Sequence, residues 1–301
     1  MAKERIGFIG VGLMGHGMAK NIVEKGYPLT IMGNRNRAPV DDLVKRGARE
    51  VKTPAEVARN SDILFLCVTD SKTIEALVRG ANGIREGAHK GLVIVDTSTA
   101  DPTSTETLHQ EMKSLGVTFC DAPLGGTPAQ AEEGKLLAMV GADKETFARI
   151  APAISCWAAK IDHLGPVGIG HKMKLINNFI AQGYGALYAE ALALGRKCGV
   201  TPDIIYKVMN GGRMDCGYFQ TFLGYAVHGN RESHKFSISN ALKDLRYVEN
   251  MAQASHTVNT LGNAVKNTYA AAVAQGRGED YVPLVVDVIA ANNGLSPYHK
   301  K

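Results

Sequence analysis

The chain has 301 residues, of which 45% are hydrophobic and 21% charged, proportions that are ordinary for a globular enzyme with a sizeable core. A chain of this length favours two domains over one. The formal net charge is only +5 and the basic residues are scattered, so we expect no nucleic-acid partner. The sequence has no signal-peptide layout, no apolar run near the ~20 residues of a membrane span, and no Cys-x-x-Cys pair among its five cysteines. We therefore expect a cytoplasmic protein with reduced thiols and no membrane partner.

A glycine-rich motif follows the first apolar strand, which we predict over 5–9. A helix predicted over 14–25 starts within that motif, whose residues are Gly10, Val11, Gly12, Leu13, Met14 and Gly15. Strand, glycines and helix in this order predict a dinucleotide site, and we expect all six residues to contact the cofactor. Gly10 permits the tight turn, Gly12 lets a pyrophosphate approach the backbone, and Gly15 lets the helix pack on the strand. A glycine-rich turn without a ligand is the alternative.

The strand predicted over 29–32 ends where such domains bind the ribose of the cofactor. An NAD-binding chain places an acidic residue about 20 residues after the glycines, but none occurs between Glu24 and Asp41. The stretch instead offers amides and guanidiniums, with candidate contacts at Asn34, Arg35 and Arg37. These groups suit a 2′-phosphate, which an acid would repel, so the sequence favours NADP(H) over NAD(H). A solvated basic turn is the alternative interpretation.

Strand and helix signals alternate up to residue 165, as in a parallel sheet with helices on both faces. Further strands are predicted over 62–68, 92–95, 117–120 and 136–141. The last of these is expected to close the sheet. Sheets of this kind hold ligands at the carboxyl ends of their strands, so Thr69, Ser98 and Thr99 are candidate contacts to cofactor or substrate. Each of the three is also compatible with a helix-capping role.

The strand over 117–120 leads into a loop with two adjacent glycines. Gly125 and Gly126 precede a capping-box sequence that runs from Thr127 to Gln130, with proline at the first helical position. Glycines ahead of a capped helix leave backbone N–H groups exposed, which suits a carboxylate or a similar anion. Gly125, Gly126 and Thr127 are therefore candidate substrate contacts. The alternative is a plain strand-to-helix turn.

The sequence beyond residue 165 is helical throughout. After a first long helix, others are predicted near 201–210, 217–226, 238–254, 257–275 and 281–292. Residues spaced as on a core-facing stripe of the long helix are Met173, Ile176, Phe179, Ile180, Leu187, Leu192 and Leu194. Lys243 and Asp244 are adjacent on another helix, so we expect them to point to different parts of its surface.

Lys174 is unusual because it lies near the start of an apolar helix, where the helix dipole disfavours cations. It shares one helix face with Asn178, four residues later. Cationic and apolar surroundings lower the pKa of a lysine toward neutrality, which a general acid needs. The alternative is a lysine whose stem covers apolar surface while its ammonium group reaches water.

Five motifs in this order resemble the β-hydroxyacid dehydrogenase family, and the resemblance covers nearly the whole chain. They are Gly7-Phe-Ile-Gly-Val-Gly-Leu-Met-Gly15, Asp96-Thr-Ser-Thr99, Asp121-Ala-Pro123, the Gly-x-Gly…Lys174-Leu-Ile-Asn-Asn178 helix and Lys243-Asp244-Leu245. The family includes 3-hydroxyisobutyrate dehydrogenases, tartronate semialdehyde reductases and glyoxylate/succinic semialdehyde reductases. The resemblance implies a doubly wound Rossmann domain over 1–165, a long interdomain helix, and an all-α domain over 166–301. It also implies a homodimer or homotetramer.

The resemblance also implies a role for individual residues. Lys174 matches the catalytic lysine and Asn178 its companion, while the matched cofactor positions are Val68, Thr99 and Lys243. We assign Asn177 and Asp244 to substrate binding. The implied reaction is hydride transfer between NADP(H) and a small β-hydroxyacid or semialdehyde acid. Lys174 would give its proton to the developing alkoxide during reduction.

The substrate loop departs from the family pattern, since Gly125 replaces the usual serine and Thr127 replaces the last glycine. The loop is similar to that of sulfolactaldehyde reductases, although those carry an arginine where this chain has Gly126. A sulfonate substrate is therefore an alternative to a small aldehyde acid. Two rival functions fit less well: an imine reductase, which commonly lacks the lysine at position 174, and an NADP-sensing scaffold without chemistry. The sequence contains no cluster of cysteines and histidines that would suggest a metal site.

Overall fold

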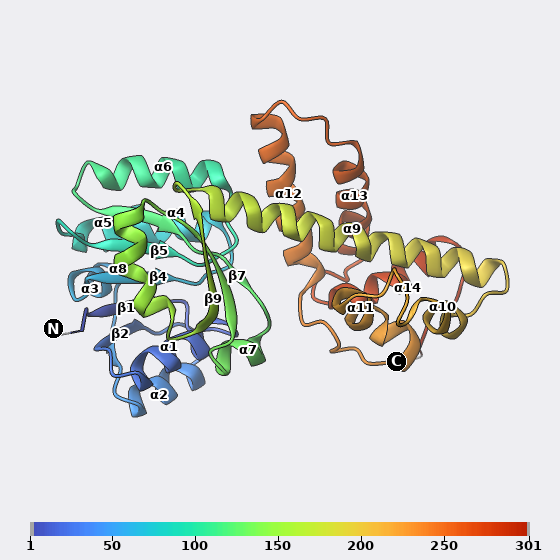
Figure 1. Ribbon diagram of the computed structural model, residues 1–301, viewed down its shortest axis with the longest axis horizontal. Coiled ribbons are helices and arrows are strands. Elements are labelled where there is room, and N and C mark those ends of the chain that lie inside the picture. Colours follow the sequence, from blue (N-terminus) through green and yellow to red (C-terminus); the bar gives the residue numbers. More distant parts are fainter. Residues whose placement is uncertain (1–2, 300–301) are drawn as a thin grey trace. The chain divides into compact units, whose positions relative to one another are not determined.

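The computed structural model describes residues 3–299, which form two compact units (Figure 1). Unit 1 extends to Lys174 and unit 2 begins at Leu175, so the division falls inside the long helix α9 (Ile169–Lys197). The boundary predicted between residues 165 and 166 lies just before this helix. The predicted fold class is confirmed, because unit 1 is an α/β unit with a largely parallel sheet and unit 2 is built of helices.

Unit 1 contains a nine-stranded sheet with the order β3-β2-β1-β4-β5-β6-β8-β7, in which β9 also pairs with β8. The strands are β1 (Ile6–Ile9), β2 (Leu29–Met32), β3 (Arg49–Val51), β4 (Ile63–Leu66), β5 (Val93–Asp96), β6 (Thr118–Asp121), β7 (Leu124–Gly125), β8 (Leu136–Gly141) and β9 (Ala158–Gly165). Along the run β3-β2-β1-β4-β5-β6, all neighbouring strands pair in parallel. Strand β8 is antiparallel to β6 and β7. The strand order reverses between β1 and β4, the position where doubly wound sheets open a crevice for a ligand.

The expectation that 136–141 closes the sheet is wrong, because β9 follows it and pairs in parallel with β8. Most residues of β9 are exposed or half-buried. The strand therefore lacks the continuous apolar run by which buried strands are predicted from sequence. The short edge strand β3 escaped prediction for the same reason, since two of its three residues are exposed.

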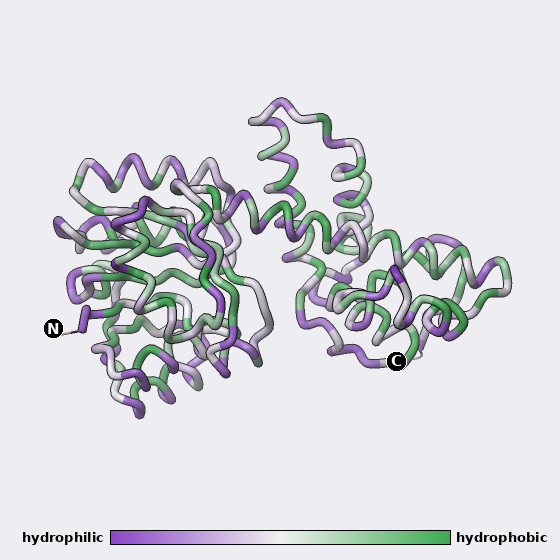
Figure 2. The backbone as a smooth tube through the Cα atoms, in the orientation of Figure 1, coloured by the Kyte–Doolittle hydropathy of each residue, from purple (hydrophilic) through white to green (hydrophobic). Residues whose placement is uncertain are grey.

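Helices cover both faces of the sheet and bury two separate cores. They are α1 (Gly15–Glu24), α2 (Ala38–Lys45), α3 (Pro54–Arg59), α4 (Ser71–Arg79), α5 (Ile84–Gly87), α6 (Pro102–Lys113), α7 (Pro128–Glu132) and α8 (Lys144–Ile154). Phe8 and Phe65 belong to one core, and Ile9 and Leu64 to the other, as expected when successive strand residues point to opposite faces. Figure 2 shows these strands as hydrophobic segments. Trp157, the only tryptophan, is fully buried edge-on to Phe65, with ring centroids 6.1 Å apart.

Unit 2 packs the rest of α9 with further helices around an aromatic core. These are α10 (Pro202–Met209), α11 (Gly217–His228), α12 (Ile238–Ala254), α13 (Thr260–Ala274) and α14 (Val285–Asn292), with a 3₁₀ turn over Val282–Leu284. The predicted helix positions agree closely with these elements. Phe222 and Tyr269 are buried against α9, where Gly185 allows the approach, since a Cβ there would lie 2.6 Å from the Tyr269 hydroxyl. Within residues 3–299, no helix combines the length and apolar character needed to cross a bilayer.

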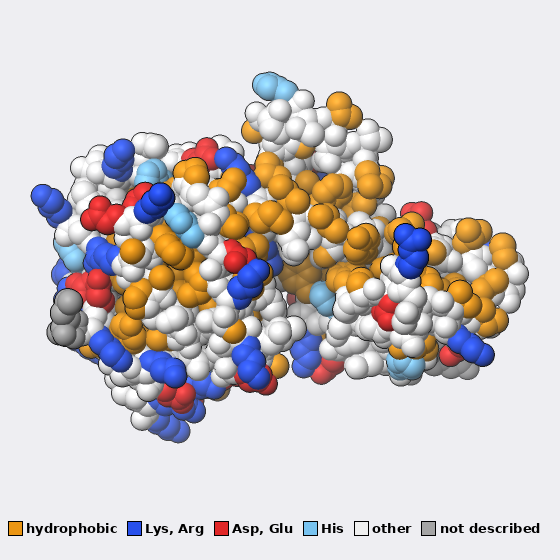
Figure 3. Space-filling view, in the orientation of Figure 1, with side chains coloured by type: hydrophobic (Ala, Val, Ile, Leu, Met, Phe, Trp, Pro, Cys, Tyr) orange, Lys and Arg blue, Asp and Glu red, His pale blue; other side chains and the backbone are white. Residues whose placement is uncertain are grey.

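The predicted core stripe of α9 is only partly correct. Phe179 and Leu192 pack against the core, but five other residues of the stripe are 40–66% exposed: Met173, Ile176, Ile180, Leu187 and Leu194. The buried side of the helix instead carries small or polar residues such as Ala189 and Gln182. Apolar residues occur on both faces of this helix, so their spacing does not reveal which face is buried. Hydrophobic side chains gather on the visible face of unit 2 (Figure 3).

Candidate active site

The glycine loop between β1 and α1 has the geometry of a dinucleotide site. Gly10 has φ +103°, and a Cβ there would lie 2.1 Å from the carbonyl oxygen of Cys67. A Cβ at Gly15 would lie 2.0 Å from the Gly10 carbonyl oxygen, so protein packing requires both glycines. A Cβ at Gly12 would meet nothing within 4 Å. The second glycine therefore faces open space, as it should where a diphosphate lies against the backbone.

The start of α1 is left available for an anion. Met14 is the N-cap residue and its side chain makes no capping hydrogen bond. Helix-start amides without a capping side chain favour an anionic ligand. The Val11 side chain is buried and that of Leu13 is 78% exposed, so the side chains of the loop serve different roles. We expect the contacts of this loop to the cofactor to come from its backbone.

The carboxyl ends of β4 and β5 are joined by hydrogen bonds. The Val68 N–H donates to Ser98 Oγ at 3.0 Å, and the Ser98 N–H donates to Asp96 Oδ1 at 2.9 Å. The structure thus brings together Val68 and Ser98, with Thr69 and Thr99 next to them in the chain. Helix α6 is capped by Asp101, so neither Ser98 nor Thr99 is its cap. The contacts of these residues to cofactor or substrate stay predictions.

The basic turn after β2 contains two arginines in different surroundings. The Arg37 guanidinium donates to both oxygens of Glu50, at 2.6 and 2.9 Å, and to Asp41 Oδ1 at 2.9 Å. Arg37 accordingly lowers the pKa of Glu50. The Arg35 side chain forms no hydrogen bond or ion pair with another residue of the described part of the chain, and its backbone N–H donates to Asn34 Oδ1 at 2.8 Å. Sequence reasoning missed Glu50 because it lies on β3, outside the stretch where an acid is expected.

The predicted substrate loop is part of the sheet edge. Gly125 ends β7 and pairs with Leu137, and Gly126 has φ +128°, which disfavours any other residue. The predicted capping box is confirmed, since Thr127 and Gln130 cap one another through backbone N–H and side-chain oxygen atoms. The Thr127 N–H is therefore used within the protein. The Gly125 N–H faces Leu137 in the β7–β8 ladder, so the loop's proposed contact to an anion is the backbone amide of Gly126.

Asp121 fixes the start of α9, and with it the position of Lys174. Its carboxylate accepts hydrogen bonds from the N–H of Gly168 at 2.6 Å and of His171 at 2.8 Å. Gly170 touches the sheet so closely that a Cβ would lie 2.3 Å from the Met139 carbonyl oxygen. Burial raises the pKa of Asp121, against the effect of these donors. Asp121 appeared in the sequence only as part of a motif, and no local pattern revealed this contact.

His171 is fully buried in the first turn of α9. Its Nδ1 lies 2.8 Å from Thr105 Oγ1, and its Nε2 lies 3.2 Å from the Ser98 carbonyl oxygen. The carboxylates of Asp96 and Asp121 are 3.8 and 3.9 Å from the ring nitrogens. A buried polar cluster therefore connects the start of α9 to the ends of β5 and β6. Among the described residues, no group of three histidine, cysteine or acidic side chains is arranged to hold a metal ion.

A second polar cluster lies in unit 2, between α9 and α12. The Asn178 amide nitrogen donates to Asp244 Oδ2 at 2.6 Å, and both residues are buried. Lys243 Nζ lies 3.0 Å from Asp244 Oδ1, so the expectation that these neighbours point apart is wrong. The long lysine stem lets its ammonium turn back toward the carboxylate. Asn177 is exposed, with its amide nitrogen 3.5 Å from Asn178 Oδ1.

The doubly wound sheet and the open glycine loop define a dinucleotide-binding protein of the Rossmann class. Comparison with known proteins gives the family. Residues 5–165 match the NAD binding domain of 6-phosphogluconate dehydrogenase. Residues 168–288 match the family described as NAD-binding of NADP-dependent 3-hydroxyisobutyrate dehydrogenase. The chain therefore belongs to the β-hydroxyacid dehydrogenase family.

Individual relatives span nearly the whole chain. It is 31% identical to 3-sulfolactaldehyde reductase of Escherichia coli (strain K12) over 291 residues, 97% of each chain. It is 32% identical to mitochondrial 3-hydroxyisobutyrate dehydrogenase of Bos taurus over 282 residues, covering 91% of this chain and 83% of the relative. The structure of Mycobacterium tuberculosis 3-hydroxyisobutyrate dehydrogenase with L-serine has a similar fold, with TM-score 0.85 and 23% identity over 95% of this chain and 99% of the other.

Proposed function

We propose that this protein is an NADP(H)-dependent reductase that interconverts a small semialdehyde acid and its β-hydroxyacid. The observation that carries this proposal is the placement of Lys174, in the second turn of a helix whose start Asp121 holds against the sheet. That sheet carries the open glycine loop in the same unit. When bound, the nicotinamide supplies a hydride to the carbonyl carbon of the substrate.

Lys174 is the proposed general acid. Its ammonium donates a proton to the oxygen of the developing alkoxide, and the neutral amine takes a proton back in the oxidative direction. Asn178 lies one turn further along α9, on the same face as Lys174. Because Asp244 accepts from the Asn178 amide nitrogen, we assign the amide oxygen of Asn178 to orienting the lysine ammonium. Lys243, paired with Asp244, is the proposed contact to the nicotinamide.

Arg35 is the proposed contact to the 2′-phosphate of NADP(H). Both predicted arginines suit a phosphate, but Arg37 is already bound by Glu50 and Asp41. These two carboxylates offset its charge, whereas the guanidinium of Arg35 retains its full attraction for an anion. We therefore assign the direct contact to Arg35 and Asn34, and a supporting role to Arg37.

The proposed substrate carries an anionic group at the end opposite the aldehyde. The backbone amide of Gly126 would hold this group, with Ser98 and Asn177 as further contacts. The names of the relatives support two substrate classes, a carboxylate and a sulfonate. The missing arginine at Gly126 favours the carboxylate, and 31% identity to a sulfolactaldehyde reductase keeps the sulfonate as a second candidate.

An activity screen with NADPH and NADH tests the proposal. The panel contains three- and four-carbon semialdehyde acids, sulfolactaldehyde, a cyclic imine, and butanal as the uncharged control for succinic semialdehyde. We expect turnover of an anionic aldehyde with NADPH and a much lower kcat/KM for butanal. Similar kcat/KM values for succinic semialdehyde and butanal would show that the loop is only a turn. NADPH binding without turnover of any compound would favour the sensing scaffold.

The exposed apolar side chains of α9 support association with a second copy of the chain. Ile176, Ile180 and Leu187 are each at least 43% exposed, which is costly for large apolar groups that stay in water. We propose a homodimer or homotetramer, which sedimentation equilibrium measures directly. A monomer at the concentrations used for activity assays would contradict this proposal.

A further inference from the structure

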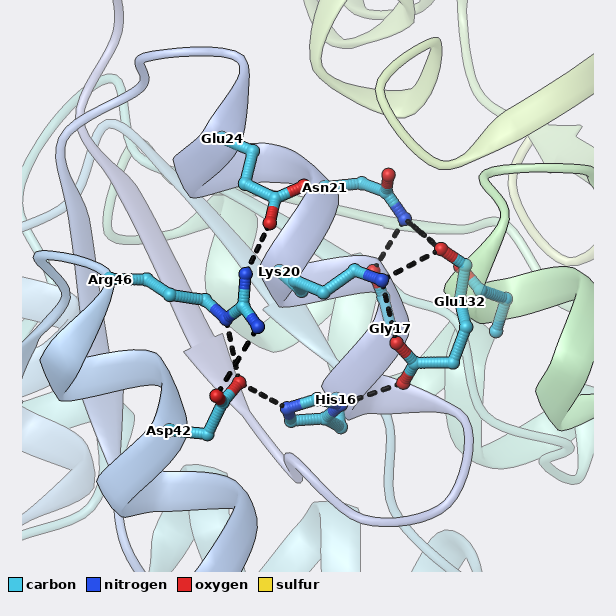
Figure 4. A network of polar contacts seen from close by, with 9 residues as sticks. His16, Gly17, Lys20, Asn21, Glu24, Asp42, Arg46 and Glu132 are labelled. Atoms are coloured by element: carbon cyan, nitrogen blue, oxygen red, sulfur yellow. Dashed lines mark hydrogen bonds and ion pairs between the residues drawn. The ribbon is translucent and has the colours of Figure 1, made fainter.

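A cluster of charged side chains lies around α1, the helix that follows the glycine loop, and has no part in the site described above (Figure 4). Its centre is His16, the second residue of α1. The Nδ1 of His16 lies 2.6 Å from Glu132 Oε1 of α7, and its Nε2 lies 2.9 Å from Asp42 Oδ2 of α2. A neutral imidazole has only one N–H, so it donates to one of these carboxylates, whereas the imidazolium donates to both.

The two carboxylates are held in their ionised form by other cations. Arg46 donates to Asp42 Oδ2 at 2.7 Å and, with His16, lowers the pKa of Asp42 to about 2. Lys20 Nζ lies 2.8 Å from Glu132 Oε2. Burial disfavours the charge on Glu132, but Lys20 and His16 outweigh it and lower its pKa. Both carboxylates therefore favour the ionised form, as acceptors for the two ring nitrogens of His16.

The same cluster joins α1 to α7 at close range. A Cβ at Gly17 would lie 2.5 Å from the Glu132 backbone nitrogen, so the two helices touch through their main chains. Asn21 Nδ2 donates to the Ala131 carbonyl oxygen at 3.0 Å, and Lys20 Nζ donates to that of Glu132 at 2.9 Å. These bonds tie carbonyl groups at the end of α7 to α1, and the Ala131 carbonyl also accepts from the Gly134 N–H at 3.2 Å. The end of α7 is thus fixed to the helix that follows the glycine loop.

We propose that His16 is a positioning residue that couples the substrate loop to the nucleotide loop. Helix α7 begins directly after Gly125 and Gly126, and α1 begins at the last glycine of the nucleotide motif. His16 holds α7 through Glu132 and α2 through Asp42. Loss of the contact to Glu132 leaves the loop at Gly125 and Gly126 less restrained. The role of that loop in substrate binding rests on the proposed function above.

Hydrogen–deuterium exchange of the 124–134 segment tests the coupling on the full-length chain without cofactor or substrate. Protection factors of the wild type and the variants are compared at one pH, after division by the intrinsic exchange rates. We expect His16→Gln to lower the protection of this segment roughly three- to tenfold, because it removes the ring that bridges Glu132 and Asp42. Glu132→Gln should lower the protection to a similar extent. Glu24→Gln is the matched control, because it breaks an ion pair with Arg46 in the same cluster without touching α7.

Two results would overturn the proposal. One is a His16→Gln variant whose segment keeps the wild-type protection, and the other is a Glu24→Gln variant that loses protection as His16→Gln does. If His16→Gln does not fold, Glu132→Gln still decides the question. Because exchange needs no turnover, a failure of the proposed function would leave this result unaffected. Once a substrate is known, His16→Gln should raise its KM with kcat nearly unchanged, whereas an equal loss in kcat would contradict a positioning role.

Discussion

The Asn178 amide donates a 2.6 Å hydrogen bond to Asp244, and this bond joins helices α9 and α12 inside unit 2. Asn178→Ala would leave the buried carboxylate of Asp244 with one donor fewer. Loss of a partner for a buried charged acceptor costs about 1–3 kcal/mol. We therefore expect a lower melting temperature and a reduced kcat, both measured on the same preparation. Asn177→Ala is the stability control, because its exposed side chain should leave the melting temperature unchanged, and equal melting temperatures for both variants would contradict the structural role of Asn178.

Lys174→Ala tests the general acid. We expect kcat to fall about 10²–10⁴-fold with NADPH affinity close to that of the wild type. Lys174→Arg should rescue little, because a guanidinium keeps its proton at any working pH. The control is Lys172→Ala, which removes a lysine from the same turn that pairs with Glu106 at 2.7 Å on the surface. A folded Lys174→Arg variant with nearly normal kcat would exclude the acid role.

The cofactor preference is tested by replacing each arginine of the basic turn. Arg35→Ala should weaken NADPH binding roughly tenfold or more, since a charge-assisted contact contributes about 1.5–3 kcal/mol, and should leave NADH binding nearly unchanged. Arg37→Ala exposes Glu50 and Asp41, so its effect on NADPH comes through repulsion. Equal losses for both cofactors in Arg35→Ala would contradict the assignment.

Glu50→Gln provides the opposite test of the same turn. Removing the Glu50 charge releases Arg37 from its strongest partner. We expect NADPH to bind more tightly and NADH to bind about as before, because only NADPH carries the 2′-phosphate. A fluorescence titration with both cofactors measures the two dissociation constants. Unchanged NADPH affinity would show that Arg37 does not reach the phosphate even when it is released.

We expect the stability of unit 1 to depend on pH through the titration of Asp121. Its pKa in the folded protein is raised by burial, so the folded state binds its proton more tightly than the unfolded state does. This contribution to stability is complete below the unfolded pKa of about 3.9 and is lost as the pH rises through the folded pKa. In Asp121→Asn this dependence is absent. The difference in unfolding free energy between wild type and variant, measured by urea denaturation, should therefore shrink with rising pH, and a growing difference would contradict the assignment.

The glycine loop and the helix caps could be predicted from sequence because their signals are local. Strand, glycines and helix follow one another between Ile6 and Glu24, and the capping box that begins at Thr127 spans four residues. In such segments the residues that make the contact are also neighbours in the chain. The fold class followed from the alternation of these segments.

The remaining contacts join residues that are far apart in the chain. Glu50 reaches Arg37 from a neighbouring strand, Asp121 reaches the start of α9, and Asp244 reaches Asn178 from another helix. No periodic pattern encodes such pairs, because they depend on the order of strands and the packing of helices. The exposed face of α9 was misassigned for a related reason. Spacing identifies a helix face, but only the packing of its neighbours decides which face is covered.

Because of the position of Trp157, the unfolding of each unit can be followed by its own intrinsic fluorescence. The single tryptophan is buried against Phe65 in unit 1, whereas every tyrosine except Tyr27 belongs to unit 2. Light absorbed only by the indole therefore reports the melting of the nucleotide unit alone. Tyrosine emission, read in a Trp157→Phe background, follows the helical unit. Coincident transitions in the two signals would mean that the units unfold as one cooperative block, and separate transitions would mean that each melts by itself.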